Sequence, residues 1–187
     1  MKDGKQRFKI ISYDPNLDQE HFSKLEDAYL KLFNENESLK YLSHSQLPFN
    51  SRTVSSFLKN ALQEGVEYYV AISDDDYHDK VMMNDKGVTP ENEIIGLSAF
   101  KSDPINGFEI IGTVVHEDHR LRGIGNALIE KGVLLGKTKG FKAVDIAVFA
   151  DNRSMLILLL KMGFKPTRME NHARSDGEDL IYLKKYL

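Results

Sequence analysis

The sequence contains no cysteine, which excludes a disulfide framework, a zinc–thiolate centre and a cysteine nucleophile. It also contains no long hydrophobic run, because its longest strongly apolar stretch, MLILLL at 155–160, is far shorter than the ~20 residues of a membrane-spanning helix. The beginning, MKDGKQRFKII, lacks the apolar core of a secretory signal. The net charge of −3 leaves no broad positive field for nucleic acid. We therefore expect a cytoplasmic protein that binds neither nucleic acid nor a membrane.

The remaining composition is that of an ordinary globular chain, and its 187 residues suit a single domain spanning 1–187. Hydrophobic periodicity and turn residues divide the chain into expected helices and strands. The first half predicts a strand at 6–14, helices at 18–36 and 51–65, a strand at 66–73, a polar connecting loop at 74–92, and an antiparallel hairpin of strands 93–101 and 108–116. The second half predicts a helix from Gly123 to Lys137, a strand at 142–150, a helix at 152–162 and a strand at 179–187. This order indicates an α/β fold with a mixed sheet, antiparallel first and with a parallel crossover in the second half.

One stretch, HRLRGIGNALIEKG at 119–132, places two arginines and two glycines directly before a helix. The first N–H groups of a helix have no acceptor within it, and the helix dipole adds partial positive charge there. Gly123 and Gly125 have no side chain that would keep an anion away from these groups, and Arg120 and Arg122 add cations of long reach. These features together predict a phosphate-binding site.

The two glycines of this stretch also occur in three less specific patterns. A Gly-x-Gly before a helix is often only a tight turn. The phosphate loop of nucleotide hydrolases needs a Gly-Lys-Ser/Thr string that this sequence lacks. A dinucleotide fingerprint would use Asp145, twenty residues after Gly125, but Leu128 replaces its third glycine and Asp145 lies inside an apolar strand.

The sequence from Arg120 to Gly125 matches the pattern R/Q-x-x-G-x-G/A and resembles the pyrophosphate-binding motif of the GCN5-related N-acetyltransferase (GNAT) superfamily. A second segment, NRSMLILLLKMGF at 152–164, resembles that family's Asn-x-x-Ala-x-x-Leu-Tyr-x-Lys-x-Gly-Phe segment. The two segments are separated by a helix and a strand, in the family's order. The resemblance covers about 108–164, and the first half fits only in its order of elements.

The resemblance implies the GNAT fold, a mixed sheet of about six to seven strands flanked by about four helices. It implies acetyl-CoA as donor. We expect no metal, because His116 and His119 lack a third ligand in the sequence. The pyrophosphate would lie against the motif, and the pantetheine arm would pair with the backbone of the strand 108–116. Asn152 would bind the arm or a water, cap the following helix, or do both. The expected cofactor-binding residues are Thr113, Val114, Val115, Arg120, Leu121, Arg122, Gly123, Ile124, Gly125, Asn126 and Asn152.

The reaction implied is direct attack of an amine on the thioester, with the carbonyl polarised by a backbone N–H near Val115 or His116. In many relatives a tyrosine at the position of Leu159 is the general acid, and leucine cannot donate a proton. The thiolate would then leave unaided or take the proton of the attacking ammonium, or Tyr182 would substitute, or the protein binds acyl-CoA without turnover.

Glu109 is the candidate base by residue type, and on a regular strand its side chain points the same way as those of Ile111 and Thr113. Some members of the family that the chain resembles carry a glutamate at the position of Ile111, two residues further along, so Glu109 would act through a water. His116 and His119 are interpreted as contacts at the rim of the cofactor site.

The acceptor would lie against 34–52 and the segment PTRMENHARSDGED before the last strand, and neither selects a particular amine. The hypotheses at this point are an acetyl-CoA-dependent N-acetyltransferase acting on an amine, a non-catalytic acyl-CoA-binding sensor, and a nucleotide-binding α/β domain. A homodimer, and a donor longer than acetyl, both stay open.

Overall fold

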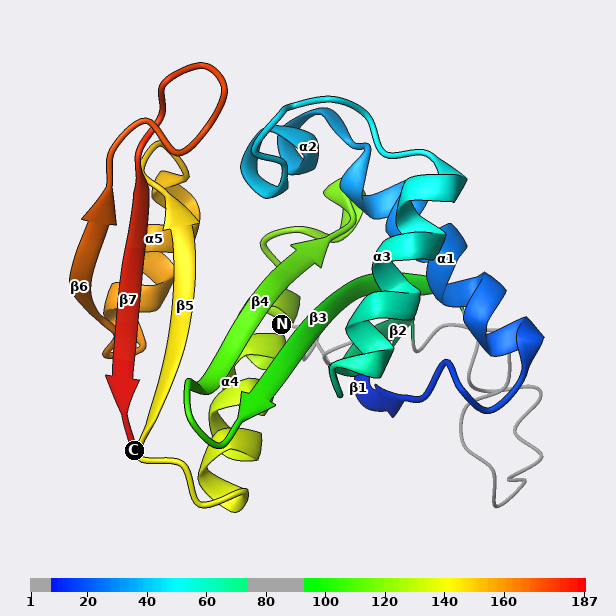
Figure 1. Ribbon diagram of the computed structural model, residues 1–187, viewed down its shortest axis with the longest axis horizontal. Coiled ribbons are helices and arrows are strands. Elements are labelled where there is room, and N and C mark those ends of the chain that lie inside the picture. Colours follow the sequence, from blue (N-terminus) through cyan, green and yellow to red (C-terminus); the bar gives the residue numbers. More distant parts are fainter. Residues whose placement is uncertain (1–7, 74–92) are drawn as a thin grey trace, which may run out of the picture.

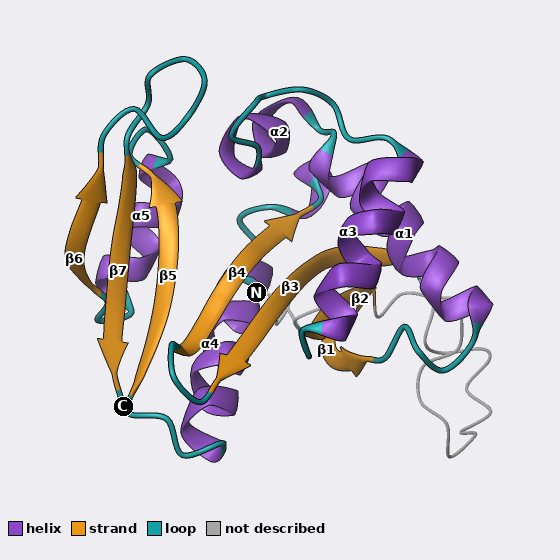
Figure 2. Ribbon diagram, viewed as in Figure 1, coloured by secondary structure: helices purple, strands orange, loops and turns teal. Residues whose placement is uncertain are grey.

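Seven strands form one continuous sheet in the computed structural model, which describes residues 8–73 and 93–187 (Figures 1 and 2). The strands are β1 (Phe8–Tyr13), β2 (Glu67–Ser73), β3 (Ile94–Asp103), β4 (Gly107–Val115), β5 (Ala143–Phe149), β6 (Lys165–Glu170) and β7 (Leu180–Tyr186). The α-helices are α1 (Gln19–Phe33), α2 (Asn36–Leu42), α3 (Ser51–Gln63), α4 (Ile124–Thr138) and α5 (Arg153–Lys161), and a single 3₁₀ turn, η1, covers Glu117–His119.

The strands lie in the order β1-β2-β3-β4-β5-β7-β6. Only β4 and β5 run parallel, and every other neighbouring pair is antiparallel. The parallel pair is connected through α4, which is the crossover that two parallel neighbours require. The predicted α/β class, the mixed sheet and the hairpin of β3 and β4 are therefore confirmed.

Helices cover both faces of the sheet and each side has its own core. Figure 1 shows α1 and α3 in front of the sheet and α4 and α5 behind it. The front core joins the apolar stripes of α1 and α3 to β2 and β3, and the rear core joins α4 and α5 to β4, β5 and β7. α4 packs so closely that a Cβ at Gly132 would lie 2.5 Å from the Phe100 ring. The same Cβ would lie 3.1 Å from the Ile110 side chain, so this close packing holds the middle of α4 against β3 and β4.

Two elements were not predicted. The segment 34–52 contains α2, which follows α1 after a break at Asn34 and Glu35, so the predicted helix 18–36 ends early. The segment before the last strand contains β6, a strand at the edge of the sheet whose six side chains are all exposed. A polar edge strand has no apolar alternation that would reveal it, and an edge tolerates Pro166. The fold thus has seven strands and five α-helices among the described residues, and the predicted loop 74–92 lies outside them.

Within the two described ranges, none of the helices combines the length and the apolar character that crossing a membrane would require.

Candidate functional site

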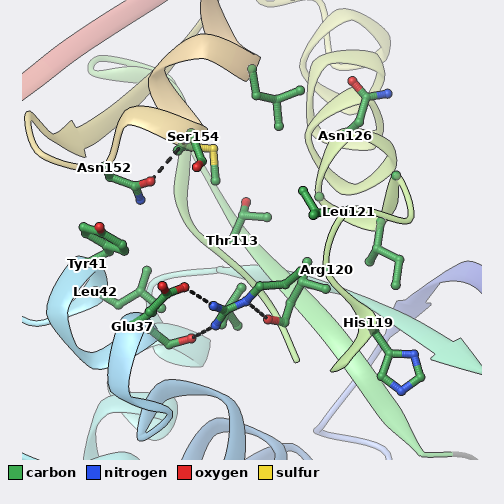
Figure 3. Close-up of a pocket in the computed structure, with 18 residues that line it drawn as sticks. Glu37, Tyr41, Leu42, Thr113, His119, Arg120, Leu121, Asn126, Asn152 and Ser154 are labelled. Carbon is green, nitrogen blue, oxygen red and sulfur yellow. Dashed lines mark hydrogen bonds and ion pairs between the residues drawn. The ribbon is translucent and has the colours of Figure 1, made fainter. Parts of the chain in front are cut away.

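A gap between β4 and β5 creates the site. The two strands pair only from Phe108 to Ile110 on β4 and from Val144 to Ile146 on β5, and beyond these residues they diverge. A cavity of about 560 Å³ lies at the diverging end, between α2, the loop after β4 and the first turns of α4 and α5 (Figure 3). Its lining residues are Glu37, Ser38, Tyr41, Leu42, Thr113, Val114, Val115, His119, Arg120, Leu121, Gly123, Ile124, Gly125, Asn126, Asn152, Ser154, Met155 and Leu158. Ten of the eleven predicted cofactor-binding residues are therefore brought together, and Arg122 is the one that does not line the cavity.

The N-terminus of α4 opens onto this cavity without a side-chain cap from any described residue. The first intrahelical bond runs from the Ala127 N–H to the Gly123 carbonyl, so the amides of the first turn have no acceptor within the helix. Gly123 has φ +87°, a left-handed conformation that glycine adopts without strain. Leu121 has φ +60° and a fully exposed side chain, which is a costly conformation for leucine. The loop therefore presents bare backbone amides and partial positive charge to the cavity.

Arg120 differs from the expectation of a free cation above these amides. Its Nε donates to the Val115 carbonyl at 3.2 Å, and its guanidinium bonds Glu35 at 3.0 Å, Ser38 at 3.1 Å and the carboxylate of Glu37. Figure 3 shows this guanidinium turned toward Glu37 and α2. Arg120 therefore ties the loop before α4 to the first turn of α2.

Arg122 is exposed, and its Nη2 donates to the Asp118 carbonyl at 2.8 Å. It remains beside the N-terminus of α4, one residue before Gly123, as a charge on the rim.

Glu35 is the central acceptor of this arrangement. Its side chain is 10% exposed, and Oε2 accepts from the Glu117 N–H at 3.1 Å as well as from Arg120. Oε1 has no hydrogen-bond partner among the described residues, and Nε2 of His116 lies 3.8 Å from it. Nδ1 of His116 accepts from the Asp118 N–H at 3.2 Å, which leaves the proton of a neutral ring on Nε2, facing Glu35. Only His119 of the two predicted rim histidines lines the cavity.

A bulge in β4 reverses the direction of its side chains. Ala99 pairs with Gly112 whereas Phe100 pairs with Ile110, so Ile111 has no partner on β3. The Gly112 carbonyl accepts instead from the hydroxyl of Ser98 at 3.0 Å. Oγ of Ser98 also lies 2.8 Å from Oγ1 of Thr113, and Thr113 reaches the cavity. Because the Ser98 proton goes to Gly112, Thr113 donates to Ser98 and offers its lone pairs to the cavity.

The bulge makes the predicted common direction of Glu109 and Thr113 wrong. Glu109 lies before the bulge, beside Lys101 on β3 and Asp145 on β5, and it does not line the cavity. The four residue steps from Glu109 to Thr113 correspond to about 13 Å along a strand. Burial raises the pKa of the Glu109 carboxyl, and the neighbouring Asp145 carboxylate raises it further, while Lys101 lowers it.

Tyr182 also lies away from the cavity lining, on β7. Its hydroxyl donates to the Glu170 carboxylate at 2.8 Å, and this bond raises the pKa of the tyrosine. The Arg168 guanidinium lies 3.7 Å from the centre of its ring. These contacts hold Tyr182 on the pair of strands β6 and β7.

The first turns of α5 complete the wall. Oδ1 of Asn152 accepts from the Met155 N–H at 3.2 Å, so Asn152 caps α5 and lines the cavity at once, as its two interpretations allowed. Met155 and Leu158 also face the cavity, whereas Leu159 is fully buried in the rear core. The position where relatives carry a tyrosine is thus occupied by a core residue.

The backbone of β4 faces the gap at alternate residues. The His116 N–H donates to the Ile95 carbonyl at 2.9 Å, so this amide points toward β3 and cannot polarise a ligand carbonyl, which corrects one of the two predicted positions. Because N–H directions alternate along an antiparallel strand, those of Thr113 and Val115 point toward β5, where the strands have diverged. Val115 is the predicted position that the structure leaves available. No group of three or more His, Asp or Glu side chains within 8–73 and 93–187 is arranged to hold a metal ion.

Fold and site together define an α/β protein with a helix N-terminus that opens onto a cleft between two diverging parallel strands. The chain belongs to the acetyltransferase (GNAT) family, whose model matches residues 40–164. No curated protein sequence matches the chain significantly.

Solved structures share the fold at low sequence identity. A phosphinothricin acetyltransferase of the GNAT superfamily from Sinorhizobium meliloti, in complex with acetyl-CoA, superposes with a TM-score of 0.70 at 14% identity, over 97% of this chain and 89% of that chain. A ribosomal-protein-alanine N-acetyltransferase from Brucella melitensis gives 0.67 at 14% identity, over 96% and 99%. An N-acetyltransferase from Staphylococcus aureus gives 0.64 at 14% identity, over 96% and 98%.

Proposed function

We propose that this protein is an acetyl-CoA-dependent N-acetyltransferase that transfers the acetyl group to a primary amine. The observation that carries the proposal is the uncapped N-terminus of α4, which opens onto the gap between β4 and β5 in a chain of the acetyltransferase family. Acetyl-CoA has a diphosphate for the amides of residues 121–126 and an amide-bearing arm for the open edge of β4. Asn152 would bind that arm from the opposite wall of the cavity.

Acetyl-CoA supplies an activated thioester, and the chain orients it and stabilises charge on its carbonyl oxygen. The N–H of Val115 is the donor for that oxygen. The amine nitrogen forms a bond to the carbonyl carbon, the carbon–sulfur bond breaks, and the ammonium proton passes to the departing thiolate. Glu109 and Tyr182 lie outside the cavity lining, so this scheme assigns neither of them the role of base or acid.

A second function is favoured by one observation. Leu159, in the rear core, leaves the usual acid position of the family without a proton donor. A protein of this kind that binds acyl-CoA without turnover would act as a sensor. Release of free thiol from acetyl-CoA, measured across a broad panel of amines, separates the two functions. Thiol release that depends on one class of amine supports the transferase, whereas saturable binding with no release in the whole panel supports the sensor.

The phosphate site is tested by substituting the glycines that flank the two ends of α4. G123E places a carboxylate where the diphosphate would lie, and G140E places one at the other end of α4, where Gly140 has φ +83° and open space around it. Both variants carry the same charge and a similar backbone strain. We expect G123E to abolish coenzyme A binding measured by calorimetry, with G140E close to wild type. Equal affinity of the two variants would disprove the phosphate site.

A further inference from the structure

We propose, on the basis of the proposed transferase function, that Arg174 is a positioning residue that closes the acceptor side of the cavity. Arg174 comes from the loop between β6 and β7, and its side chain is 1% exposed. An arginine buried this completely is rare without dedicated partners. Its partners come from both walls of the gap, from α2 and from the turn before α5.

All five N–H groups of the guanidinium have an acceptor. Nη1 and Nη2 donate to the two oxygens of Asp151 at 3.1 and 2.7 Å, and Nε and Nη2 donate to those of Asp176 at 2.8 and 3.0 Å. The fifth bond runs from Nη1 to the Lys40 carbonyl of α2 at 3.1 Å. The guanidinium carbon also lies 4.9 Å from the centre of the Phe149 ring. One side chain thus joins the loop between β6 and β7, the turn before α5 and the end of α2.

A second set of bonds connects the same loop to the segment after α2. Nδ1 of His44 bonds the Ala173 carbonyl at 2.9 Å, and the Ser175 N–H donates to the His44 carbonyl at 2.8 Å. Nε2 of Gln46 donates to Asp176 at 2.9 Å. In Figure 1 these segments stand at the end of the molecule where β4 and β5 diverge. We call the bonds of Arg174, His44 and Gln46 the Arg174 bridge.

Residues of the bridge adjoin residues that line the cavity. Asp151 precedes Asn152, and Lys40 precedes Tyr41 and Leu42. α2 has only seven residues and no side-chain cap at its N-terminus among the described residues, so it is not stable by itself. Arg120 holds its first turn through Glu37 and Ser38, and Arg174 holds its last turn through the Lys40 carbonyl. The position of Tyr41 over the cavity therefore depends on both arginines.

A merely structural role and a positioning role predict different measurements. If Arg174 positions α2 and Asn152, R174Q should lower kcat/KM for the most reactive amine of the panel by about 10- to 100-fold, since misplacement far from the reacting atoms costs this much. The pyrophosphate amides of α4 lie outside the bridge, so R174Q should keep most of the coenzyme A affinity, and any loss should be limited to the contact of Asn152 with the arm. R174K keeps the charge but not the two paired contacts, and should restore only part of the rate. V144A, a substitution in the rear core, is the control for loss of stability alone.

Amide hydrogen exchange tests the bridge without any turnover. In wild type, local opening of residues 36–46 requires the bonds of the Arg174 bridge to break. R174Q removes this requirement, so amide exchange of residues 36–46 should accelerate by about tenfold or more. V144A should leave the exchange of these residues at the wild-type rate. Unchanged exchange at 36–46 in folded R174Q, or a loss of kcat/KM no larger than that of V144A, would overturn the proposal. Absence of thiol release by the wild type would contradict the proposed function alone, and the exchange measurement would still decide the bridge.

Discussion

Nη2 of Arg120 lies 3.0 Å from Oε2 of Glu35, so the first arginine of the glycine motif is bonded to the segment that leads into α2. Glu35 is mostly buried and accepts from the Glu117 N–H with the same oxygen. The motif thus has two roles: its amides face the cavity, and its arginine holds the wall opposite. This pair connects the expected donor site to the expected acceptor side.

Replacing Arg120 should therefore lower the free energy of unfolding more than it lowers the affinity for the phosphate ligand. R120M leaves the Glu35 carboxylate without its cation, and a hydrogen bond to a charged group contributes about 1.5–3 kcal/mol. We expect the free energy of unfolding in urea to fall by about 2 kcal/mol. The double variant R120M/E35M should recover part of this loss, because the buried charge is then absent. A stability equal to wild type in R120M would show that the bonds to α2 contribute nothing.

Replacing Arg122 should instead weaken coenzyme A binding and leave stability nearly unchanged. This side chain is exposed, and its loss should change the free energy of unfolding by no more than about 0.5 kcal/mol. Its charge lies beside the N-terminus of α4, so R122Q should weaken coenzyme A binding at low ionic strength. The difference from wild type should shrink as salt is added, because exposed charges are screened. Calorimetric titrations at several salt concentrations measure this, and a difference that salt does not change would indicate a direct bond instead.

The raised pKa of Glu109 should make the stability of the wild type depend on pH. Its pKa is raised in the folded state, so the folded protein binds more protons than the unfolded one as pH rises above the ordinary 4.5. Its contribution is thus favourable below the ordinary pKa and is lost as pH rises through the raised pKa. E109Q, which is neutral at every pH, should have a higher unfolding midpoint than wild type at neutral pH and no advantage well below 4.5. Thiol release, where present, should persist in E109Q, and its loss would return Glu109 to the reaction.

The hydroxyl of Ser98 should contribute mainly to folding stability, and that of Thr113 mainly to coenzyme A binding. S98A leaves the half-buried Gly112 carbonyl at the bulge without its donor, which should lower the free energy of unfolding by about 1 kcal/mol, the low end of the cost of an unsatisfied buried acceptor. T113V removes the hydroxyl that faces the cavity and should weaken coenzyme A binding more than S98A does. Chemical unfolding and calorimetry on both variants check the order. A T113V variant with wild-type affinity would show that the Thr113 oxygen accepts nothing from the ligand.

How much the sequence predicts depends on how local the cause is. Gly123 and the amphipathic pattern after it specify a helix N-terminus through neighbouring residues, and the structure has that helix with Gly123 before it. The direction of Glu109 failed for a non-local reason, because the bulge at Ile111 arises from pairing with β3. The sequence did not predict β6, because all the side chains of this edge strand are exposed and no apolar alternation marks it.

Arg120 and Arg174 show the same limit among charged residues. Both lie in polar segments, and the sequence alone indicates only that they are cations near loops. Their partners are 82 to 85 residues away for Glu35, Glu37 and Ser38, and 134 residues away for the Lys40 carbonyl. Only the fold brings these groups together, so a ligand role was the natural expectation for Arg120 and none was expected for Arg174.

The Arg174 bridge should persist into acid. Arg174 holds the pKa of Asp151 and that of Asp176 below the ordinary 3.8, and Lys40 and Gln46 add to this on one carboxylate each. A lowered carboxyl pKa stabilises the folded state above its ordinary value, and the contribution is lost as pH falls through the lowered pKa. Wild type should therefore exceed R174Q in urea midpoint by a constant difference at neutral and mildly acidic pH. That difference should decrease only once pH falls below 3.8, as both carboxylates take up protons. A difference that already disappears at mildly acidic pH would mean that another group, such as a histidine, controls the bridge.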